Sequence, residues 1–134
     1  MAKWFSNDIL EKGPDHLKAL AAGGKTITQH IVKAYTAGDS YATVVGNSVM
    51  SVSIADGDMT WGAGTLSGRA LTVAAKSAVS ITADSGATPD LHIALVNTTD
   101  SAVHVVTDET TNQVLTSGGS KDIPAWAVQC PQPA

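Results

Sequence analysis

The residues best suited to chemistry lie in one stretch of the chain, where histidines alternate with acidic side chains. His92 and His104 flank the turn-forming sequence Asn97-Thr98-Thr99-Asp100, and Asp108 and Glu109 follow closely. Imidazole and carboxylate groups bind divalent metals and carry out general acid–base catalysis. The stretch is therefore either part of an active site or a pair of ordinary strands with polar residues.

The order of residues favours a β-hairpin. Residues 91–96 and 102–107 both alternate apolar and polar side chains, and a hairpin centred on Thr98 would pair them. In that register His92 faces His104, and the aliphatic residues gather on the opposite face. Two facing imidazoles could supply two ligands of a metal site. Alternatively, they are polar side chains on one face of the hairpin with no role in metal binding.

A third ligand decides between these alternatives, because zinc sites take three or four protein ligands. Asp90, Asp108 and Glu109 fall beyond the ends of the predicted paired region. We therefore expect both histidines to cover a half-exposed face. We expect no metal-ligating, catalytic or cofactor-binding residue and no bound cofactor.

Other candidate motifs are incomplete. Gly62, Gly64 and Gly68 resemble a dinucleotide-binding loop with one residue too many, and we interpret the stretch as a flexible loop between strands. The sequence 56–58 begins like a calcium loop but lacks its later ligands. Residues 97–99 fit a glycosylation acceptor, which we interpret as a turn. Paired carboxylates for glycoside hydrolysis stay open, but with two glutamates and one arginine in the chain we predict that it is not an enzyme.

The composition limits the classes of partner that the chain is expected to bind. The 134 residues carry a net charge of −4, and the eight basic residues are scattered, so we expect neither a nucleic-acid partner nor an anionic membrane. Cys130 is the sole cysteine, which excludes an intrachain disulfide. No signal-peptide or membrane-spanning run is present. A core of small residues buries little area, so we expect a homo-oligomer, a dimer or trimer.

The first 24 residues contain the helical part of the chain and are predicted to form an N-terminal arm with a short helix. Ser6 or Asn7 caps a first turn, Gly13-Pro14 interrupts it, and Gly23-Gly24 ends the helix. Trp4 and Phe5 precede this helix. They pack either on the chain's own core, which aromatic residues favour, or on a partner.

Residues 25–134 are predicted to form a β-sandwich domain. Runs of β-branched and alternating residues are separated by turns rich in Gly, Asp and Ser. The fold class is therefore mainly β: a small β-sandwich or jelly-roll-like barrel of about seven to eight strands with a short N-terminal helix. The predicted strands are 26–35, 49–55, 69–75, 78–83, 91–96, 102–107 and 122–130.

Several motifs occur together in an order that indicates a family. They are "WFSNDIL" near the start, "SGRALTVAAKS", "LHIALVN", "VVTDET", "QVLTSG" and "DIPAW". In these motifs the chain resembles small virion structural proteins of tailed bacteriophages, of the capsid decoration or cement kind. The resemblance covers the first dozen residues and most of 67–126. The sequences "ADSGATPD" and "NTTDSA" depart from it in the loops.

The resemblance implies a head decoration or cement protein that binds the outside of the capsid and bridges major capsid protein subunits. It implies synthesis in the host cytoplasm and a final place on the phage head surface. An acidic surface suits the outside of a capsid better than its DNA-facing side. The expected contacts to the shell or to a sister subunit lie on the N-terminal arm, at Trp4, Phe5, Ile9 and Leu10.

Two other functions stay open. The chain could be a tail, neck or head-fibre component, or a module that binds the host surface. A small metal-dependent or hydrolytic enzyme is the remaining alternative, for which His92 and His104 would have to line a pocket with a convergent carboxylate.

Overall fold

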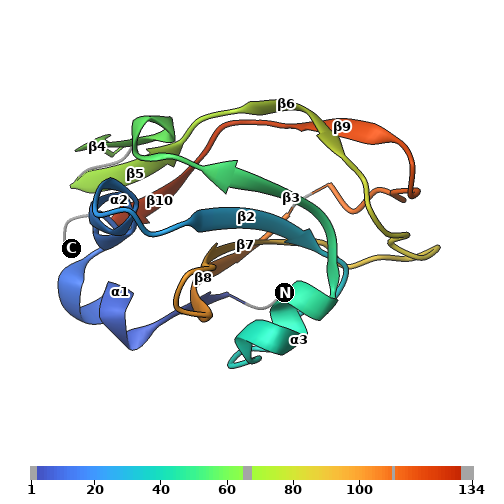
Figure 1. Cartoon of the computed structure of the whole chain (residues 1–134), viewed down its shortest axis with the longest axis horizontal. Coiled ribbons are helices and arrows are strands. Elements are labelled where there is room, and N and C mark those ends of the chain that lie inside the picture. The colour runs from blue at the N-terminus through green and yellow to red at the C-terminus, as the bar shows by residue number, and fades with distance from the viewer. Residues whose placement is uncertain (1–2, 65–67, 110, 131–134) are drawn as a thin grey trace.

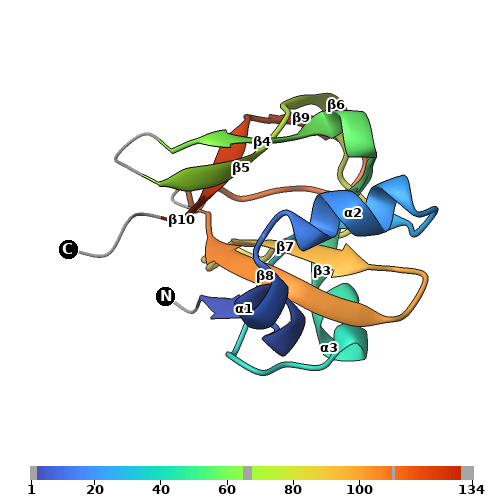
Figure 2. The ribbon, with the colours of Figure 1, turned by 90° about the vertical axis from the view of Figure 1, so that its left-hand side faces the viewer.

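Two layers of antiparallel β-sheet, seen edge-on in Figure 2, make up most of the chain. The structure is a computed structural model that describes residues 3–64, 68–109 and 111–130. Ten strands account for 43% of the residues and helices for 17%, so the prediction of a mainly-β fold is confirmed, and the arrangement fits a small β-sandwich.

The first layer is a five-stranded sheet in the order β1-β8-β7-β2-β3. Its two-residue edge strand, β1, pairs with β8 near the middle of that strand, so that Trp4 lies opposite Val106. The strands are β1 (Trp4–Phe5), β2 (Ile27–Val32), β3 (Ser48–Ile54), β7 (His92–Asn97) and β8 (Ala102–Asp108).

The second layer combines a three-stranded sheet with a two-stranded ribbon. The sheet has the order β10-β5-β4, and the ribbon pairs β6 with β9. Figure 1 shows β6 and β9 continuing away from β5 and β10, so the ribbon extends the sheet. The strands are β4 (Met59–Ala63), β5 (Arg69–Val73), β6 (Lys76–Ser80), β9 (Ser120–Ile123) and β10 (Trp126–Cys130).

Two predictions for this layer, one of a strand and one of a loop, need correction. The run 122–130 is divided between β9 and β10, since Pro124 has no amide hydrogen to continue the ladder. The stretch 61–68 is predicted as a flexible loop, but residues 61–63 belong to β4, and residues 65–67 lie outside the described part of the structure. Gly62 is tolerated there because β4 is an edge strand whose neighbour β5 holds it along its whole length.

In the described ranges, four short helical segments connect the strands: α1 (Asn7–Lys12), α2 (His16–Ala22), α3 (Tyr41–Gly46) and the 3-10 turn η1 (Asp56–Asp58). The predicted cap at Ser6 is confirmed, because its Oγ accepts the amide hydrogen of Ile9 at the start of α1. Gly13, with φ of 87°, separates α1 from α2, as glycine does readily. The prediction that the helical part of the chain lies within the first 24 residues is wrong, because α3 forms at Tyr41–Gly46. Ser40 caps α3 in the same way as Ser6 caps α1.

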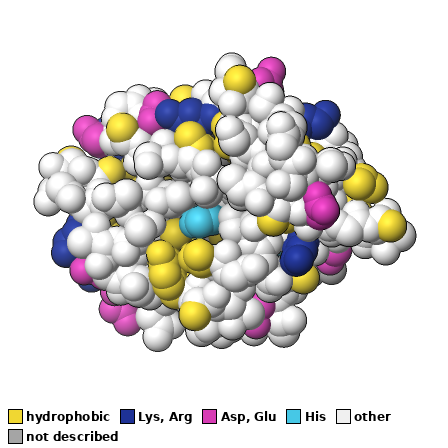
Figure 3. All heavy atoms as spheres, turned by 45° about the vertical axis from the view of Figure 1, so that its right-hand side comes forward, with side chains coloured by type: hydrophobic (Ala, Val, Ile, Leu, Met, Phe, Trp, Pro, Cys, Tyr) yellow, Lys and Arg dark blue, Asp and Glu magenta, His cyan; other side chains and the backbone are white. Residues whose placement is uncertain are grey.

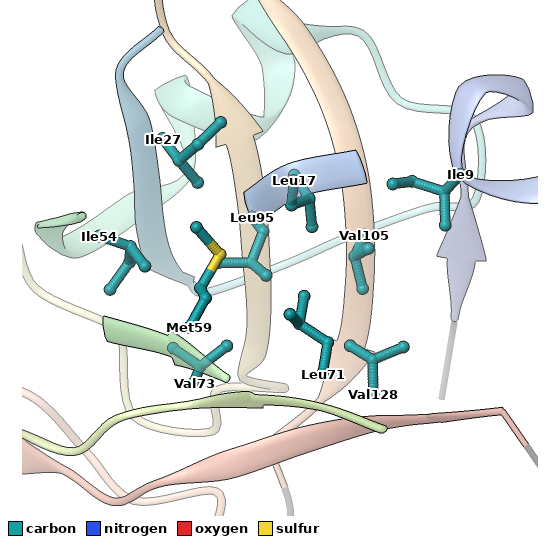
Figure 4. Packing of buried hydrophobic residues seen from close by; sticks show 10 residues of the cluster. All are labelled: Ile9, Leu17, Ile27, Ile54, Met59, Leu71, Val73, Leu95, Val105 and Val128. Carbon is teal, nitrogen blue, oxygen red and sulfur yellow. The ribbon is translucent and has the colours of Figure 1, made fainter. Parts of the chain in front are cut away.

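The hydrophobic core has three parts. The interior cluster lies between the layers and is closed at the side by α1 and α2, as Figure 4 shows. A second cluster lies between the first layer and the β6–β9 ribbon. The third covers the outer face of the first layer, beneath α3 and residues 33–40. The interior cluster comprises Ile9, Leu17, Ile27, Ile54, Met59, Leu71, Val73, Leu95, Val105 and Val128.

This arrangement buries β7 on both faces, and every residue of that strand is buried. Ile9 and Leu17 belong to the interior cluster, so the N-terminal 24 residues and the β portion share one core. Within the described ranges, no helix has the length and apolar character needed to cross a bilayer.

Candidate functional site

The β7–β8 hairpin carries both histidines singled out in the sequence, but in a different register from the one predicted. His92 lies opposite Asp108 and Leu95 opposite Val105, and a bulge follows between Leu95 and Val96. The prediction that His92 faces His104 is therefore wrong.

The cause is the turn. Asn97 and Asp100 hold each other through two hydrogen bonds, from Asn97 Nδ2 to Asp100 Oδ2 at 2.8 Å and from the Asp100 amide to Asn97 Oδ1 at 3.1 Å. Ser101 adopts a left-handed φ of 54°. The turn is thus built over residues 98–101, not centred on Thr98, and this shifts the register by three residues. The bulge between Leu95 and Val96 adds a fourth residue, so that His92 lies opposite Asp108 at the far end of the hairpin.

Neither histidine covers a half-exposed face, so this prediction is also wrong. The exposed fraction is 0% for His92 and 2% for His104. The outer face of the first layer is covered by α3 and by the loop of residues 33–40, and the Tyr35 ring centroid lies 5.7 Å from that of His92. His104 lies against the N-terminal helices, with its ring 6.1 Å from that of His16.

Asp90, His92 and Asp108 form a donor cluster at the open end of the hairpin. Each offers one ligand atom, and these atoms all lie within 4.8 Å of one another. His92 Nε2 is 3.9 Å from Asp108 Oδ1, and His92 Nδ1 is 3.0 Å from the backbone oxygen of Asp90. His92 is buried, Asp108 is half-buried and Asp90 is exposed. This donor set can hold a divalent cation.

Sequence reasoning missed this cluster because it placed Asp90 and Asp108 outside the paired region. The Asn97…Asp100 spacing was the available signal, since Asn and Asp hydrogen-bond backbone groups two or three residues away and lengthen a turn. The longer turn and the bulge between Leu95 and Val96 together bring Asp108 opposite His92.

His104 ties the N-terminal segment to β8. Its Nδ1 lies 2.9 Å from Ser6 Oγ, and its backbone oxygen accepts the Ser6 amide hydrogen at 2.9 Å. Among the described residues its Nε2 has no hydrogen-bond partner. Burial lowers the pKa of His104 below its usual value. The ring is therefore held neutral at a junction between the helix cap and the sheet.

A groove of about 260 Å³ runs along the side of the sandwich where β1 and β8 face β10. Its walls include Lys3, Phe5 and Thr107 from the first layer and residues 126–129 from the second. In the part of the chain that the structure describes, β10 pairs only with β5, so its second edge faces this side without a partner strand. An open edge offers backbone hydrogen-bonding groups to another chain.

The four predicted contact residues lie in different environments. Phe5 is 36% exposed at the groove. Trp4 is half-buried and packs against the third cluster. Ile9 is 2% exposed, within the interior cluster. The Leu10 side chain lies outside the described part of the structure.

Charged side chains are dispersed on the face of the molecule that Figure 3 shows. Figure 3 shows acidic and basic side chains scattered over the face in view, with no gathering of either sign. Several charges are paired, such as Lys25 with Asp100 at 3.1 Å and Lys76 with Asp58 at 2.7 Å.

Comparison of the chain with protein-family models, curated proteins and solved structures found no match.

Proposed function

We propose that this chain is a virion structural protein of a tailed bacteriophage, a head decoration or cement protein that binds the outside of the capsid and bridges major capsid protein subunits. The observation that carries the proposal is the exposure of Phe5 beside the open edge of β10. An aromatic side chain next to the edge of an outermost strand offers apolar area and hydrogen-bonding groups to one partner segment.

The position of Phe5 on a paired strand supports a role in assembly. Backbone pairing of β1 with β8 holds Phe5 opposite Val105, so its exposed ring is carried on a fixed sheet edge. Docking on a fixed edge costs less ordering entropy than docking on a flexible tail. Many copies on a symmetric lattice then gain avidity, although each single contact is small.

Self-association is part of the same proposal. The groove between β1/β8 and β10 is open to a segment of a sister subunit, and a closed dimer or trimer would bring several Phe5 side chains to one capsid position. Sedimentation velocity and native mass spectrometry of the purified chain measure its oligomeric state. A monomer at tens of micromolar would contradict this part.

The test of the capsid role uses heads assembled without the protein, to which purified chain is added back. We expect binding in numbers comparable to the major capsid protein and greater resistance of the heads to heat. Phe5→Ala should weaken binding at least tenfold, because hot-spot aromatic residues carry about 2 kcal/mol or more.

Val114→Ala is the matched control, since Val114 is the other large exposed hydrophobic residue described, at 58% exposure, and it lies away from the groove. It should bind like the unmodified chain. Scarcity of the chain in purified virions, or its recovery with tails or necks, would overturn the head assignment.

A further inference from the structure

We propose that Asp90, His92 and Asp108 bind a divalent transition-metal ion of the Zn²⁺ class, with the fourth position open to water. This site is independent of the virion role. The first argument is convergence: a nitrogen and two carboxylate oxygens from three residues lie within 4.8 Å of one another. Three protein ligands and one open position is a ligand count that zinc accepts.

The second argument is the orientation of the imidazole. A backbone carbonyl only accepts, so the 3.0 Å contact between His92 Nδ1 and the Asp90 oxygen places the ring hydrogen on Nδ1. In the neutral ring the lone pair then belongs to Nε2, the atom that lies 3.9 Å from Asp108 Oδ1. A carbonyl bonded to the far nitrogen is the usual outer partner of a metal-binding histidine.

The third argument is that the backbone around the ligands is already fixed. The Leu91 amide donates to Asn112 Oδ1 at 2.9 Å, and the Leu91 oxygen accepts the Glu109 amide hydrogen at 2.9 Å. Leu91 lies between Asp90 and His92, and Glu109 follows Asp108, so these bonds hold all three ligand positions. The loop before β7 is thereby held to the residues after β8.

The fourth argument concerns reach and charge. Ligand atoms bound to zinc at about 2.0–2.1 Å stand about 3.4 Å apart in a tetrahedron. Ligand atoms within 4.8 Å of one another must therefore close by up to about 1.4 Å, and His92 Nε2 and Asp108 Oδ1, at 3.9 Å, by about 0.5 Å. The exposed Asp90 side chain can rotate to meet the ion, and the same exposure gives the ion an entry path. Two carboxylates balance the charge of the ion, and the imidazole favours Zn²⁺ over Ca²⁺.

The experiment is isothermal titration of the full chain with ZnCl₂ and, in parallel, CaCl₂ at pH 7.5, with nitrogen-detected NMR of the histidine rings. We expect one Zn²⁺ per chain, no saturable Ca²⁺ binding, and a shift of the His92 Nε2 resonance. Asp90→Asn, which changes an exposed side chain, should weaken Zn²⁺ binding at least tenfold, and Asp108→Asn should do the same.

Glu11→Gln on α1 removes an equal charge elsewhere and should leave the affinity unchanged. The absence of saturable Zn²⁺ binding would overturn the proposal. So would full affinity in Asp90→Asn and Asp108→Asn together with an unmoved His92 resonance, because the ion would then lie elsewhere. If Asp108→Asn fails to fold, Asp90→Asn and the NMR shift still decide the question.

Discussion

The indole N–H of Trp126 on β10 donates to Oε1 of Gln29 on β2 at 2.7 Å, and this bond joins the two β layers. Gln29 is 0% exposed and occupies the inward position between Ile27 and Ile31. Its amide nitrogen has no hydrogen-bond partner among the described residues. The pair therefore places one satisfied and one unsatisfied polar atom between the interior and second clusters.

Loss of the indole donor should destabilise the fold. Trp126→Phe leaves Gln29 Oε1 buried without its partner, and we expect the free energy of unfolding to fall by about 1–3 kcal/mol. Gln29→Met removes both polar atoms while keeping the volume, so Trp126→Phe should cost less in that background. Urea unfolding of the four chains measures the coupling. Equal costs in both backgrounds would mean that the hydrogen bond contributes nothing.

Mild acid should weaken the fold through two buried histidines. Burial lowers the pKa of both His30 and His104 below the value of about 6.5 in an unfolded chain. The unfolded chain therefore binds more protons, and the free energy of unfolding falls as pH drops below about 6.5. Urea midpoints at pH 7.5 and 5.0 measure the drop, which should shrink in His104→Gln and in His30→Gln.

Ser6→Ala is the control for His104, because it removes the hydrogen bond to the ring and the cap of α1 but no titrating group. It should cost about 1 kcal/mol at both pH values and leave the difference between them in place. An unchanged pH dependence in a chain that lacks both His30 and His104 would contradict the assignment.

Asp58 should matter more than a typical surface acid. Its Oδ2 accepts from Lys76 Nζ at 2.7 Å and from the Ala55 amide at 2.9 Å, and these bonds, the Lys76 bond foremost, lower the pKa of Asp58. We expect Asp58→Asn to cost about 1 kcal/mol by thermal or urea unfolding. Asp8→Asn breaks an exposed pair with Lys12 and should cost about 0.5 kcal/mol at most. Similar costs for the two variants would refute the distinction.

Ala78 is a site where glycine should stabilise. Its φ is 52°, in the bulge of β6, and its amide donates to Asp122 Oδ1 at 2.7 Å. A side chain in this left-handed region is strained, so Ala78→Gly should raise the free energy of unfolding by up to about 1 kcal/mol. Ala55→Gly, at an ordinary φ of −83°, should lower it. Destabilisation by both changes would show that no strain is present at Ala78.

The thiol of Cys130 should react slowly. Burial raises its pKa above the usual 9.0, and the charge of Asp15 raises it further. Iodoacetamide at pH 8 should therefore label the native chain more slowly than the urea-unfolded chain, since the thiolate is the nucleophile. Asp15→Asn should speed labelling of the native chain. Equal rates for native and unfolded chains would contradict this.

The sequence predicts most strands because their alternation is local. Val52 and Ile54 point inward from β3 while Ser51 and Ser53 are exposed, as the period of two requires. Ser6 and Gly23 mark helix ends through hydrogen bonds to neighbouring residues, so these boundaries are also readable.

What the sequence does not predict depends on distant parts of the chain. Residues 41–46 are rich in β-branched side chains, and α3 forms because Val44 packs on the outer face of the first layer. The His92–Asp108 pairing follows from a turn whose length is set by Asn97 and Asp100, and from the bulge between Leu95 and Val96. Burial of His92 follows from a covering loop that no local pattern reveals.

The bond from Ser6 to His104 spans 98 positions along the chain, and the bond from Gln29 to Trp126 spans 97. Synthesis proceeds from the N-terminus, so neither hydrogen bond can form until its second residue, His104 or Trp126, has been synthesised. The first layer is not complete until β8 has left the ribosome, and the second not until β10 has. A stalled or truncated product would leave Ile27 and Leu71 open to solvent and would be a substrate for chaperones and proteases.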